Sequence, residues 1–489
     1  MKSRLLILFL ILSQYAVAQH VYTLDDVIAI AQDSSLTAFK YKNMYLASYW
    51  QFRNYKADRL PSLSLNLTPV AYNRQLISRY DSESDMDVYR QQKSYSANGS
   101  LTLSQNFTPI GGTFTITTSL DYLRYFGAST YNQFNAVPLS VGYAHTMFGY
   151  NKYKWEKKIE PIKFEKAKLQ YLYNAEQIAT TALTYFFNLA QAQYKLKNAK
   201  DQVERCDTLY SMGLLKFNIA SITKNDLRNL ELDVITAKNS VYEAEVEIKK
   251  ASLSLAMFLG IDKNAEIELV LPDNPEEFEV DVQKALDLMN QNSYLILEKL
   301  QSVTEAEQEL DMVKKQNRFT ASVNASVGFN QQAETLEDAY VDPLRRDVVS
   351  VSLMIPLLDW GVRKGQRNRA ENNLNIALID QEQNMQELEQ NLVVTINELK
   401  SRYFLLLSAQ ESQRIAQEVY NENVKRFQNG TIDITALSSS QQRLQTALDS
   451  YVSSMYQYWL CYYSLRKQTL YDFSKNISLS EEFDFNNIR

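Results

Sequence analysis

Side chains that could carry catalysis or bind a metal are scarce in this sequence. It has two histidines, His20 and His145, and two cysteines, Cys206 and Cys461, which we interpret as small buried residues of long helices. We place His145 on the polar face of a strand and His20 at the mature N-terminus, and neither has the further ligands that a metal site needs. The pair Asp25-Asp26 is placed to cap a helix, and no glycine-rich phosphate loop occurs. We therefore expect no enzyme, no metal and no other cofactor.

Charge and hydropathy narrow the class of protein further. The 489 residues carry 51 Lys and Arg against 57 Asp and Glu, so no basic excess points to nucleic acid as a partner. The first 18 residues are typical of an export signal: Lys2 and Arg4 precede the apolar run Leu5–Leu12, and Ala16-Val17-Ala18 offers a cleavage site. No later apolar run is long enough for a membrane-spanning helix. If the exported chain is integral to a membrane, it must therefore use strands.

Two blocks of short strands are predicted, one in residues 61–147 and one in residues 319–357. In both blocks apolar residues alternate with small uncharged ones, as in Leu63-Ser64-Leu65-Asn66-Leu67. A period of two fits a soluble sandwich as well as a barrel with lipid outside and water inside. The export signal favours the barrel, and so do the tyrosines at strand ends, which would suit an aromatic girdle: Tyr72, Tyr95, Tyr122, Tyr125 and Tyr143.

Long helices are predicted between and after the strand blocks. Apolar residues recur there at alternating spacings of three and four, as from Leu227 to Phe258 and from Leu437 to Leu465. Spacing of this kind, sustained over many turns, is typical of coiled-coil packing. A helix from about Lys364 to Gln428 would be ~95 Å long at 1.5 Å per residue. It must therefore run alongside partners in this chain or in copies of it.

The chain also matches itself at two successive offsets. Asn66 corresponds to Asn324 at an offset of 258 residues, and Ile222 corresponds to Ile432 at an offset of 210 residues. A colinear match of strands and helices indicates an internal duplication. The offsets differ by 48 residues, which predicts an insertion of that size between about Tyr72 and Asn135.

Three motifs carry a resemblance to a known family. The segments Lys216–Leu227 and Arg426–Leu437 both look like a basic-aromatic helical hairpin turn followed by Leu on the returning helix, and Pro356–Gly361 resembles a strand exit into a long helix. With the order of elements, these motifs resemble the TolC-type outer-membrane efflux proteins over nearly the whole mature chain. The resemblance implies a mainly α fold with membrane β-strands: coiled-coil hairpins form a periplasmic α-barrel, and three protomers share one outer-membrane β-barrel.

The resemblance also implies function, location and partners. We expect the exit duct of a tripartite efflux or type I secretion system, held in outer-membrane lipid as a homotrimer with a large periplasmic part. A periplasmic adaptor would dock at the hairpin turns and link the duct to an inner-membrane pump of the RND or ABC type. The expected tip residues are Phe217, Ala220, Ser221, Phe427, Gly430 and Thr431, and the candidate gate charges are Lys224, Asp226 and Asp433.

The expected organisation follows the duplication. A signal peptide at 1–18 precedes a first repeat at 19–260, and a linker at 261–280 leads to a second repeat at 281–470 and a C-terminal tail at 471–489. The first repeat contains strands at 61–147, with an extra hairpin at about 95–125, and a helical turn near 213–222. The second repeat contains strands at 319–357 and a helical turn near 428–433.

The inserted segment leaves two structural alternatives open. It could add two membrane strands, Tyr95–Phe107 and Gly112–Tyr125, with long outer loops at Asn73–Ser94 and Gly127–Phe134. Each protomer would then supply six strands, and a trimer eighteen. The hairpin could instead fold over outside the membrane. A second class of function also stays open, a secreted or periplasmic coiled-coil structural or adhesive protein without a pore.

Overall fold

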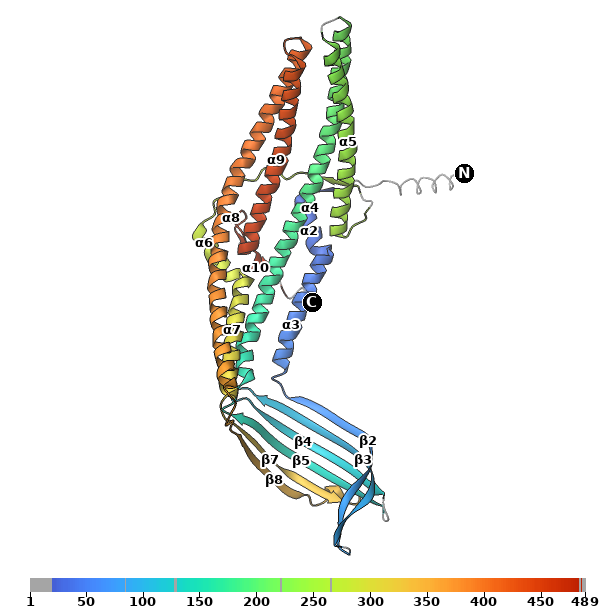
Figure 1. Ribbon diagram of the computed structural model, residues 1–489, viewed down its shortest axis with the longest axis vertical. Helices are drawn as coiled ribbons and strands as arrows, with labels where there is room; N and C mark the ends of the chain where they lie inside the picture. The colour runs from blue at the N-terminus through green and yellow to red at the C-terminus, as the bar shows by residue number, and fades with distance from the viewer. Residues whose placement is uncertain are drawn as a thin grey trace, which may run out of the picture. The chain divides into compact units, whose positions relative to one another are not determined.

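The computed structural model describes residues 20–83, 85–126, 130–219, 222–263, 266–482 and Phe485 (Figure 1). The predicted signal peptide therefore lies outside the described residues. The chain forms two compact units, and each unit takes segments from both halves of the sequence. Unit 1 draws on Met1–Leu46, Ala167–Ile296 and Met385–Arg489, and unit 2 on Ala47–Lys166 and Leu297–Asn384. Four helices continue from one unit into the other: α3 (Leu36–Ala57), α4 (Lys152–Asn218), α7 (Tyr294–Gln316) and α8 (Val362–Gln428).

Unit 2 contains one six-stranded antiparallel sheet in the order β2-β3-β4-β5-β7-β8. The inserted segment of the first half therefore adds two strands to the same sheet. The tight turn at residues 108–111 joins the two added strands, where Gly111 adopts a φ of 83°. The strands are β2 (Ser62–Asp81), β3 (Met86–Phe107), β4 (Gly112–Phe126), β5 (Tyr131–Met147), β7 (Thr320–Ala333) and β8 (Leu344–Met354), with a 3₁₀ turn, η2 (Asp338–Tyr340), before β8.

The two predicted outer loops are wrong in extent. Most of Asn73–Ser94 is strand, because β2 continues to Asp81 and β3 begins at Met86. These extensions pair with each other from Arg74↔Lys93 to Asp81↔Met86 and form a two-stranded ribbon beyond the end of β4. The predicted loop Gly127–Phe134 is also shorter than expected, since β5 begins at Tyr131 and residues 127–129 lie outside the described part.

Unit 1 is built mainly of helices. The longest helices that contribute to it are α4 and α8, which have 67 residues each when their parts in unit 2 are included. Helices α5 and α9 have 36 residues each. No helix in the described residues is long and apolar enough to cross a membrane. The remaining elements are α2 (Leu24–Ser34), α5 (Lys224–Leu259), α6 (Val282–Asn292), α9 (Ile434–Thr469), α10 (Leu479–Glu482), and the short strand pairs β1 (His20–Tyr22) with β6 (Ile267–Leu269) and β9 (Tyr471–Asp472) with β10 (Ile477–Ser478).

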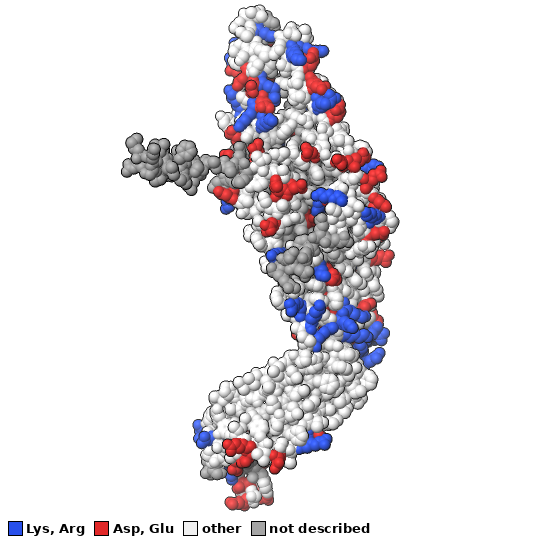
Figure 2. Space-filling model, turned by 180° about the vertical axis from the view of Figure 1, so that it is seen from behind, with Lys and Arg blue, Asp and Glu red and all other residues white. Residues whose placement is uncertain are grey.

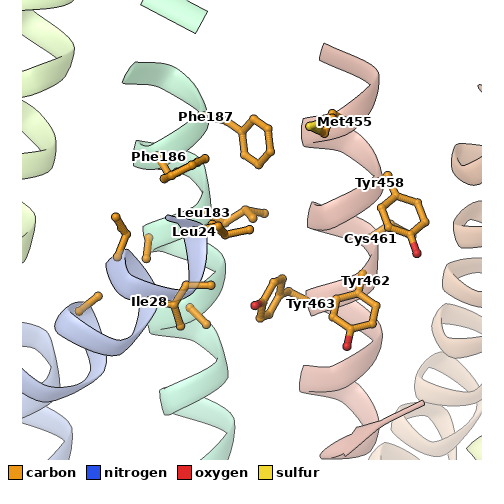
Figure 3. Packing of buried hydrophobic residues seen from close by; sticks show 14 of the residues in the cluster. Leu24, Ile28, Leu183, Phe186, Phe187, Met455, Tyr458, Cys461, Tyr462 and Tyr463 are labelled. Atoms are coloured by element: carbon orange, nitrogen blue, oxygen red, sulfur yellow. The ribbon is translucent and has the colours of Figure 1, made fainter. Parts of the chain in front are cut away.

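The hydrophobic core of unit 1 lies where α2, α4 and α9 meet (Figure 3). Phe186 and Phe187 of α4 are buried, and Phe187 points toward Met455 of α9. Tyr458 lies on the opposite side of α9, where its ring is 6.2 Å from that of Tyr403 in α8. Leu24 of α2 fills the space beside α4. Burying aromatic side chains of this size removes a large apolar area from water. This burial stabilises the packed helices, whose intrinsic helix propensity alone would not hold them together.

Helix α2 begins with a capping box. Thr23 accepts a hydrogen bond from the backbone N–H of Asp26, and the Asp26 carboxylate accepts one from the backbone N–H of Thr23. Of the predicted capping pair, Asp26 therefore takes part and Thr23 is the N-cap itself. Both cysteines are buried and free of disulfides, as predicted.

We predict opposite effects for two Gly→Ala substitutions in unit 2. A Cβ at Gly328 would lie 2.4 Å from the backbone oxygen of Leu139, so Gly328→Ala should force β5 and β7 apart and lower stability by about 1–3 kcal/mol. A Cβ at Gly365, inside α8, would meet nothing within 4 Å, so Gly365→Ala should raise stability by up to about 1 kcal/mol. Thermal unfolding of the detergent-extracted protein measures both changes, and equal midpoints for the two variants would contradict the packing of β5 against β7.

Candidate functional site: the hairpin turns and a two-faced sheet

The second helical turn, between α8 and α9, is closed by local hydrogen bonds. The N–H of Gly430 donates to the Phe427 oxygen (3.0 Å) and the N–H of Thr431 donates to the Arg426 oxygen (3.0 Å), the pattern of a Schellman motif. Gly430 has a φ of 72°, which a residue with a Cβ adopts only at a cost. Asp433 then caps α9 by accepting from the N–H of Ala436 (2.8 Å).

The first helical turn, between α4 and α5, is capped differently. Thr223 and Asp226 form a capping box, in which Asp226 accepts from the Thr223 N–H (2.9 Å) and the Asp226 N–H donates to the Thr223 hydroxyl (3.2 Å). The Thr223 hydroxyl also donates to the Asp226 carboxylate (2.7 Å), and this hydrogen bond, followed by the one from the Thr223 backbone N–H, lowers the pKa of Asp226. The predicted tip residues Ala220 and Ser221 lie outside the described residues. Phe217, at the end of α4, is exposed.

The ends of the two hairpins are held together by one lysine. Lys216 Nζ of α4 donates to the backbone oxygen of Phe427 in α8 (3.0 Å) and lies 4.6 Å from the centre of the Phe427 ring. Phe427 itself is buried. It belongs to a small apolar cluster to which all four long helices contribute: Leu209, Leu230, Tyr420, Phe427, Leu437, Leu444 and Leu448. The chain therefore makes a specific polar contact between its hairpins beside a packed apolar one.

The three candidate gate charges have different surroundings. Asp226 and Asp433 both serve as parts of helix N-caps, which gives each a structural role within one chain. Lys224 is exposed, and no hydrogen bond or ion pair of its side chain is recorded among the described residues. Their role in gating stays a prediction.

The sheet of unit 2 has two chemically distinct faces. One face carries a row of small uncharged residues across five strands: Ser64, Thr102, Thr117, Ser140 and Gly328. The other face carries an apolar row across the same strands: Leu63, Leu103, Ile116, Val141 and Val327. Leu63 is 65% exposed and Val327 is 52% exposed, so the chain covers neither end of the apolar row itself. An apolar face left open over several strands indicates a further partner or a membrane.

Aromatic side chains border the apolar face at both ends. Tyr95 faces Tyr72 across β2 and β3, its ring lies 5.9 Å from that of Tyr122, and Tyr122 lies 4.9 Å from Phe134. A second row nearer the helices joins Phe107, Phe114 and Tyr143, with ring centres 5.9 Å and 4.5 Å apart. Phe114 and Tyr122 lie roughly 26 Å apart along β4 at about 3.3 Å per residue. Tyr143 belongs to this second row.

On strands β2 to β7 the apolar face between the aromatic rows carries no Lys, Arg, Asp or Glu, whereas on β8 Asp347 lies opposite Val327 of the apolar row. Figure 2 shows no Lys, Arg, Asp or Glu over the middle of the sheet on the face that it displays. The sequence of the strands agrees with this, because each strand has a stretch without charged residues: 62–73, 94–107, 112–120, 131–147, 320–333 and 348–354.

His145 is not where the sequence placed it. It shares a face with Tyr143 and Val141, opposite Val323, and its ring stacks on Tyr143 at 6.1 Å, so it belongs to the apolar face and not to the polar one. The reason is that the alternation of β5 places residues 141, 143 and 145 on one side. Among the described residues, no group of three or more His, Cys, Asp or Glu side chains could hold a metal ion.

Comparison with known families identifies part of this architecture. Residues 285–467 match the sequence model of the family described as Outer membrane efflux protein. This chain resembles the outer membrane efflux proteins. The resemblance predicted from the hairpin turns is thereby confirmed, and the matched segment includes the second turn at Gly430. No match is found among curated protein sequences.

Solved structures extend the likeness from this segment to the fold of almost the whole chain. The Campylobacter jejuni CmeC outer membrane channel is 14% identical, with a TM-score of 0.66 over 95% of this chain and 90% of that one. The outer membrane protein VceC from Vibrio cholerae is 13% identical, with a TM-score of 0.64 over 91% of this chain and 95% of that one. The open state of the Neisseria gonorrhoeae MtrE outer membrane channel is 13% identical, with a TM-score of 0.60 over 91% and 88%. Together these show that the chain has the fold of such channels.

A buried ion network in this efflux-protein fold was not predicted from the sequence. Arg466 of α9 donates to both carboxylate oxygens of Glu176 in α4 (2.8 and 3.1 Å) and to Asp472 of β9 (3.1 Å). Glu176 is 4% exposed and Asp472 is 2% exposed. Because a charge that loses its partner in such a place is costly, the network fixes the C-terminal segment against α4 and α9.

Hydrogen bonding at Asp472 outweighs the effect of burial on its acidity. Burial alone would raise the pKa of Asp472. The Tyr462 hydroxyl (2.6 Å), the backbone N–H of Lys475 (3.1 Å) and the charge of Arg466 stabilise the carboxylate and hold its pKa below the usual value. The stability that Asp472 contributes is therefore present above the unfolded pKa near 4 and is lost as the pH falls through the folded pKa.

We predict that Asp472→Asn destabilises unit 1 by about 1–3 kcal/mol at pH 7, because the variant loses the charged acceptor for Arg466. The gap between wild type and variant should narrow as the pH falls below about 4, where the wild-type carboxylate becomes protonated. Urea unfolding at pH 7 and at acidic pH measures this gap. Asp449→Asn, at an exposed position of α9, the helix that carries Arg466, serves as the control and should change little. A gap that stays constant or widens in acid would refute this account of Asp472.

Proposed function

We propose that this protein is the outer-membrane exit duct of a tripartite efflux or type I secretion system. Three copies would enclose one water-filled path from the periplasm to the exterior, gated at the periplasmic end. The observation that carries the proposal is the two-faced sheet with two unpaired edges, in a chain with the fold of outer membrane channels.

The edges of the sheet support assembly from several copies. Strands β2 and β8 each pair on one side only within the chain. Unpaired strand edges cannot face lipid, because the bilayer core offers no hydrogen-bond partner. The chain has an even number of alternating strands, so β8 of one copy runs antiparallel to β2 of the next. Three copies would close a barrel of eighteen strands, a size that leaves an aqueous channel.

The spacing of the aromatic rows supports placing all six strands in the membrane. Outer-membrane barrels carry an apolar band about 25 Å tall between aromatic girdles. The inserted strands β3 and β4 contribute to both rows through Tyr95, Tyr122, Phe107 and Phe114. A hairpin folded away from the membrane would have no need to continue these rows in register. We therefore favour six membrane strands per protomer over the folded-over hairpin.

The polar face would then line the duct inside the membrane. It offers mainly hydroxyls and amides, for example the paired hydroxyls of Thr102 and Thr117 at 3.4 Å, and one cation, Arg346 of β8, opposite Gly328. Such a lining keeps water in the path and selects little by charge. Selection among cargoes would fall to the gate and to the pump.

The helices supply the periplasmic part of the proposal. The helices α4 and α8 begin 210 residues apart and have equal lengths, and so do α5 and α9. Before the insertion the offset is 258: α2 and α6 begin at Leu24 and Val282, and β2 and β7 at Ser62 and Thr320. These matches support the internal two-fold repeat, with the 48 inserted residues located in β3 and β4.

Docking and gating are assigned to the hairpin turns. Phe217, Phe427, Gly430 and Thr431, with Ala220 and Ser221, would form the periplasmic tip at which an adaptor docks and through it an RND or ABC pump supplies energy. Lys224, Asp226 and Asp433 remain the candidate gate charges. The contact from Lys216 to the Phe427 oxygen would resist separation of the hairpins. A secreted coiled-coil protein without a pore gains no support from a channel fold with an uncovered apolar sheet.

We predict that the protein extracted from outer membranes has about three times the mass of the mature chain by native mass spectrometry; the full chain, with its predicted signal peptide, has a mass of 56.5 kDa. Edge pairing is tested by cysteine cross-linking in a background with Cys206→Ala and Cys461→Ala. Ser64→Cys on β2 combined with Ser350→Cys or Ser352→Cys on β8 should give cross-linked species up to the trimer, because these positions share the polar face. The matched control, Ser64→Cys with Val351→Cys, places the thiols on opposite faces and should not cross-link. A soluble monomer, or equal cross-linking in the control, would overturn the proposed barrel.

We predict that Lys216→Met raises the open probability of the duct in planar bilayers roughly 2- to 12-fold. The reason is that one hydrogen bond between hairpins, worth about 0.5–1.5 kcal/mol, is lost. Lys250→Met, at an exposed position of α5, controls for the loss of a positive charge. If both variants conduct like the wild type, Lys216 does not hold the hairpins closed.

A further inference from the structure

One end of the sheet is surrounded by an excess of positive charge. The residues that flank the sheet at its helix end lie in 53–60, 148–160, 309–319 and 355–371, which we call the basic collar. They contain fourteen Lys and Arg and seven Asp and Glu, in a chain whose net charge is −6. The segments at the opposite end, 74–93, 121–126 and 334–347, contain seven Lys and Arg and ten Asp and Glu. Figure 2 shows the blue patch directly beside the uncharged surface of the sheet.

Hydrogen bonds between its four segments make the collar one continuous structure within unit 2. Arg59 after α3 donates to the Tyr153 oxygen of α4 (3.4 Å), and Trp155 of α4 donates to Asp311 of α7 (2.8 Å). Asn317 after α7 donates to the Arg363 oxygen of α8 (3.1 Å). The four segments therefore present their charges side by side.

Several collar cations have no acidic partner among the described residues. No ion pair is recorded there for Lys157, Arg318, Lys364 or Arg369, and all four side chains are exposed. Other collar residues do pair, such as Lys314 with Glu371 at 3.8 Å. An excess of like charges that the chain leaves uncompensated indicates a negatively charged partner.

The turns next to the collar expose large apolar side chains. Leu357, Leu358 and Trp360, between β8 and α8, are 91%, 71% and 89% exposed, and Phe148, between β5 and α4, is 65% exposed. Trp360 and Phe148 have φ values of 55° and 60°, which are strained for bulky residues. Backbone strain that holds an aromatic side chain in water calls for a compensating partner. A soluble phosphate or an acidic protein segment would satisfy the cations and leave these side chains uncovered.

We infer that the basic collar and the exposed turns bind anionic diacyl phospholipid, of the phosphatidylglycerol type, in the leaflet on the helix side of the sheet. This inference rests on the membrane placement in the proposed function. The phosphate groups pair with Lys157, Arg318, Lys364 and Arg369, while Trp360, Leu357 and Phe148 enter the boundary between headgroups and acyl chains, where aromatic residues are favoured. The long Lys and Arg side chains can lie along apolar surface and keep their charge at the headgroups. The opposite end, with its acidic excess, does not share this preference.

The test compares lipid retention by the detergent-extracted full-length protein in native mass spectrometry. Phosphatidylglycerol is titrated against phosphatidylcholine, which has the same acyl chains and no net charge. The collar variant combines Lys157→Gln, Arg318→Gln, Lys364→Gln and Arg369→Gln. A matched control combines Lys40→Gln, Lys200→Gln, Lys249→Gln and Lys250→Gln, four exposed lysines of unit 1.

Wild type and matched control should retain phosphatidylglycerol in preference to phosphatidylcholine. The collar variant should lose at least roughly tenfold of that preference, because each cation raises binding to an anionic surface roughly fivefold. Equal loss in the matched control, or an unchanged preference in the collar variant, would overturn the inference. Oligomer mass and conductance are measured on the same samples. A collar variant that keeps lipid preference, trimer mass and conductance refutes the lipid site alone, whereas a monomeric, non-conducting wild type refutes the proposed function.

Two further arms separate lipid from other partners and from misfolding. Glycerol phosphate at the lipid's concentration should not displace phosphatidylglycerol, and displacement would mean a soluble-phosphate site instead. Trp360→Gly relieves the positive φ, so its thermal midpoint should equal or exceed that of the wild type while lipid retention falls. Unchanged retention in Trp360→Gly would show that the exposed turns do not engage the lipid.

Discussion

The rest of this structure depends on an antiparallel sheet with two unpaired edges and one exposed apolar face. Among the described residues, β2 and β8 each have one unpaired edge, and the apolar row is exposed at both ends, at Leu63 and Val327. The unpaired edges alone, or the exposed apolar face alone, could each be satisfied in several ways. In the function that we propose, lipid over the face and further copies at the edges would resolve both together, because closure would remove the edges that lipid cannot tolerate. The even number of strands makes that closure antiparallel throughout.

The helical hairpins meet a different constraint. A compact core at one point cannot stabilise helices of 67 residues. They therefore need packing contacts at several places along their length. The structure does this with a large aromatic core around Phe186 and Tyr458, the buried network of Arg466, and the smaller cluster around Phe427. The last of these is the smaller of the two apolar clusters, and Lys216 and Arg205 of α4 add contacts to Phe427 and Tyr420 of α8 there. That end of the hairpins is therefore the place where separation costs least, which is the property a gate needs.

The sequence predicted the elements that repeat a strong local pattern. The helix expected at 364–428 is observed at Val362–Gln428, and the extra strands were recognised by their alternation. The ribbon at 74–93 gives no strand signal in the sequence because, beyond the apolar band, both its faces carry mixed residues and the period of two disappears. His145 lies on the apolar face because the register it shares with Tyr143, and not its polarity, decides which side of β5 it occupies.

Contacts between distant residues could not be predicted in this way. Glu176 and Arg466 are 290 positions apart, and neither belongs to a recognisable motif, so their pairing becomes visible only when α4 and α9 are packed together. A local signal did exist for Asp226: the spacing Thr-x-x-Asp at Thr223 indicates a capping box, which explains that charge before any gate is invoked. The same reasoning separates the collar from the tip. At the tip most charges have a local hydrogen-bonding role, whereas Lys157, Arg318, Lys364 and Arg369 have none recorded within the described chain, and it is this lack of an internal role that makes them informative about what surrounds the protein.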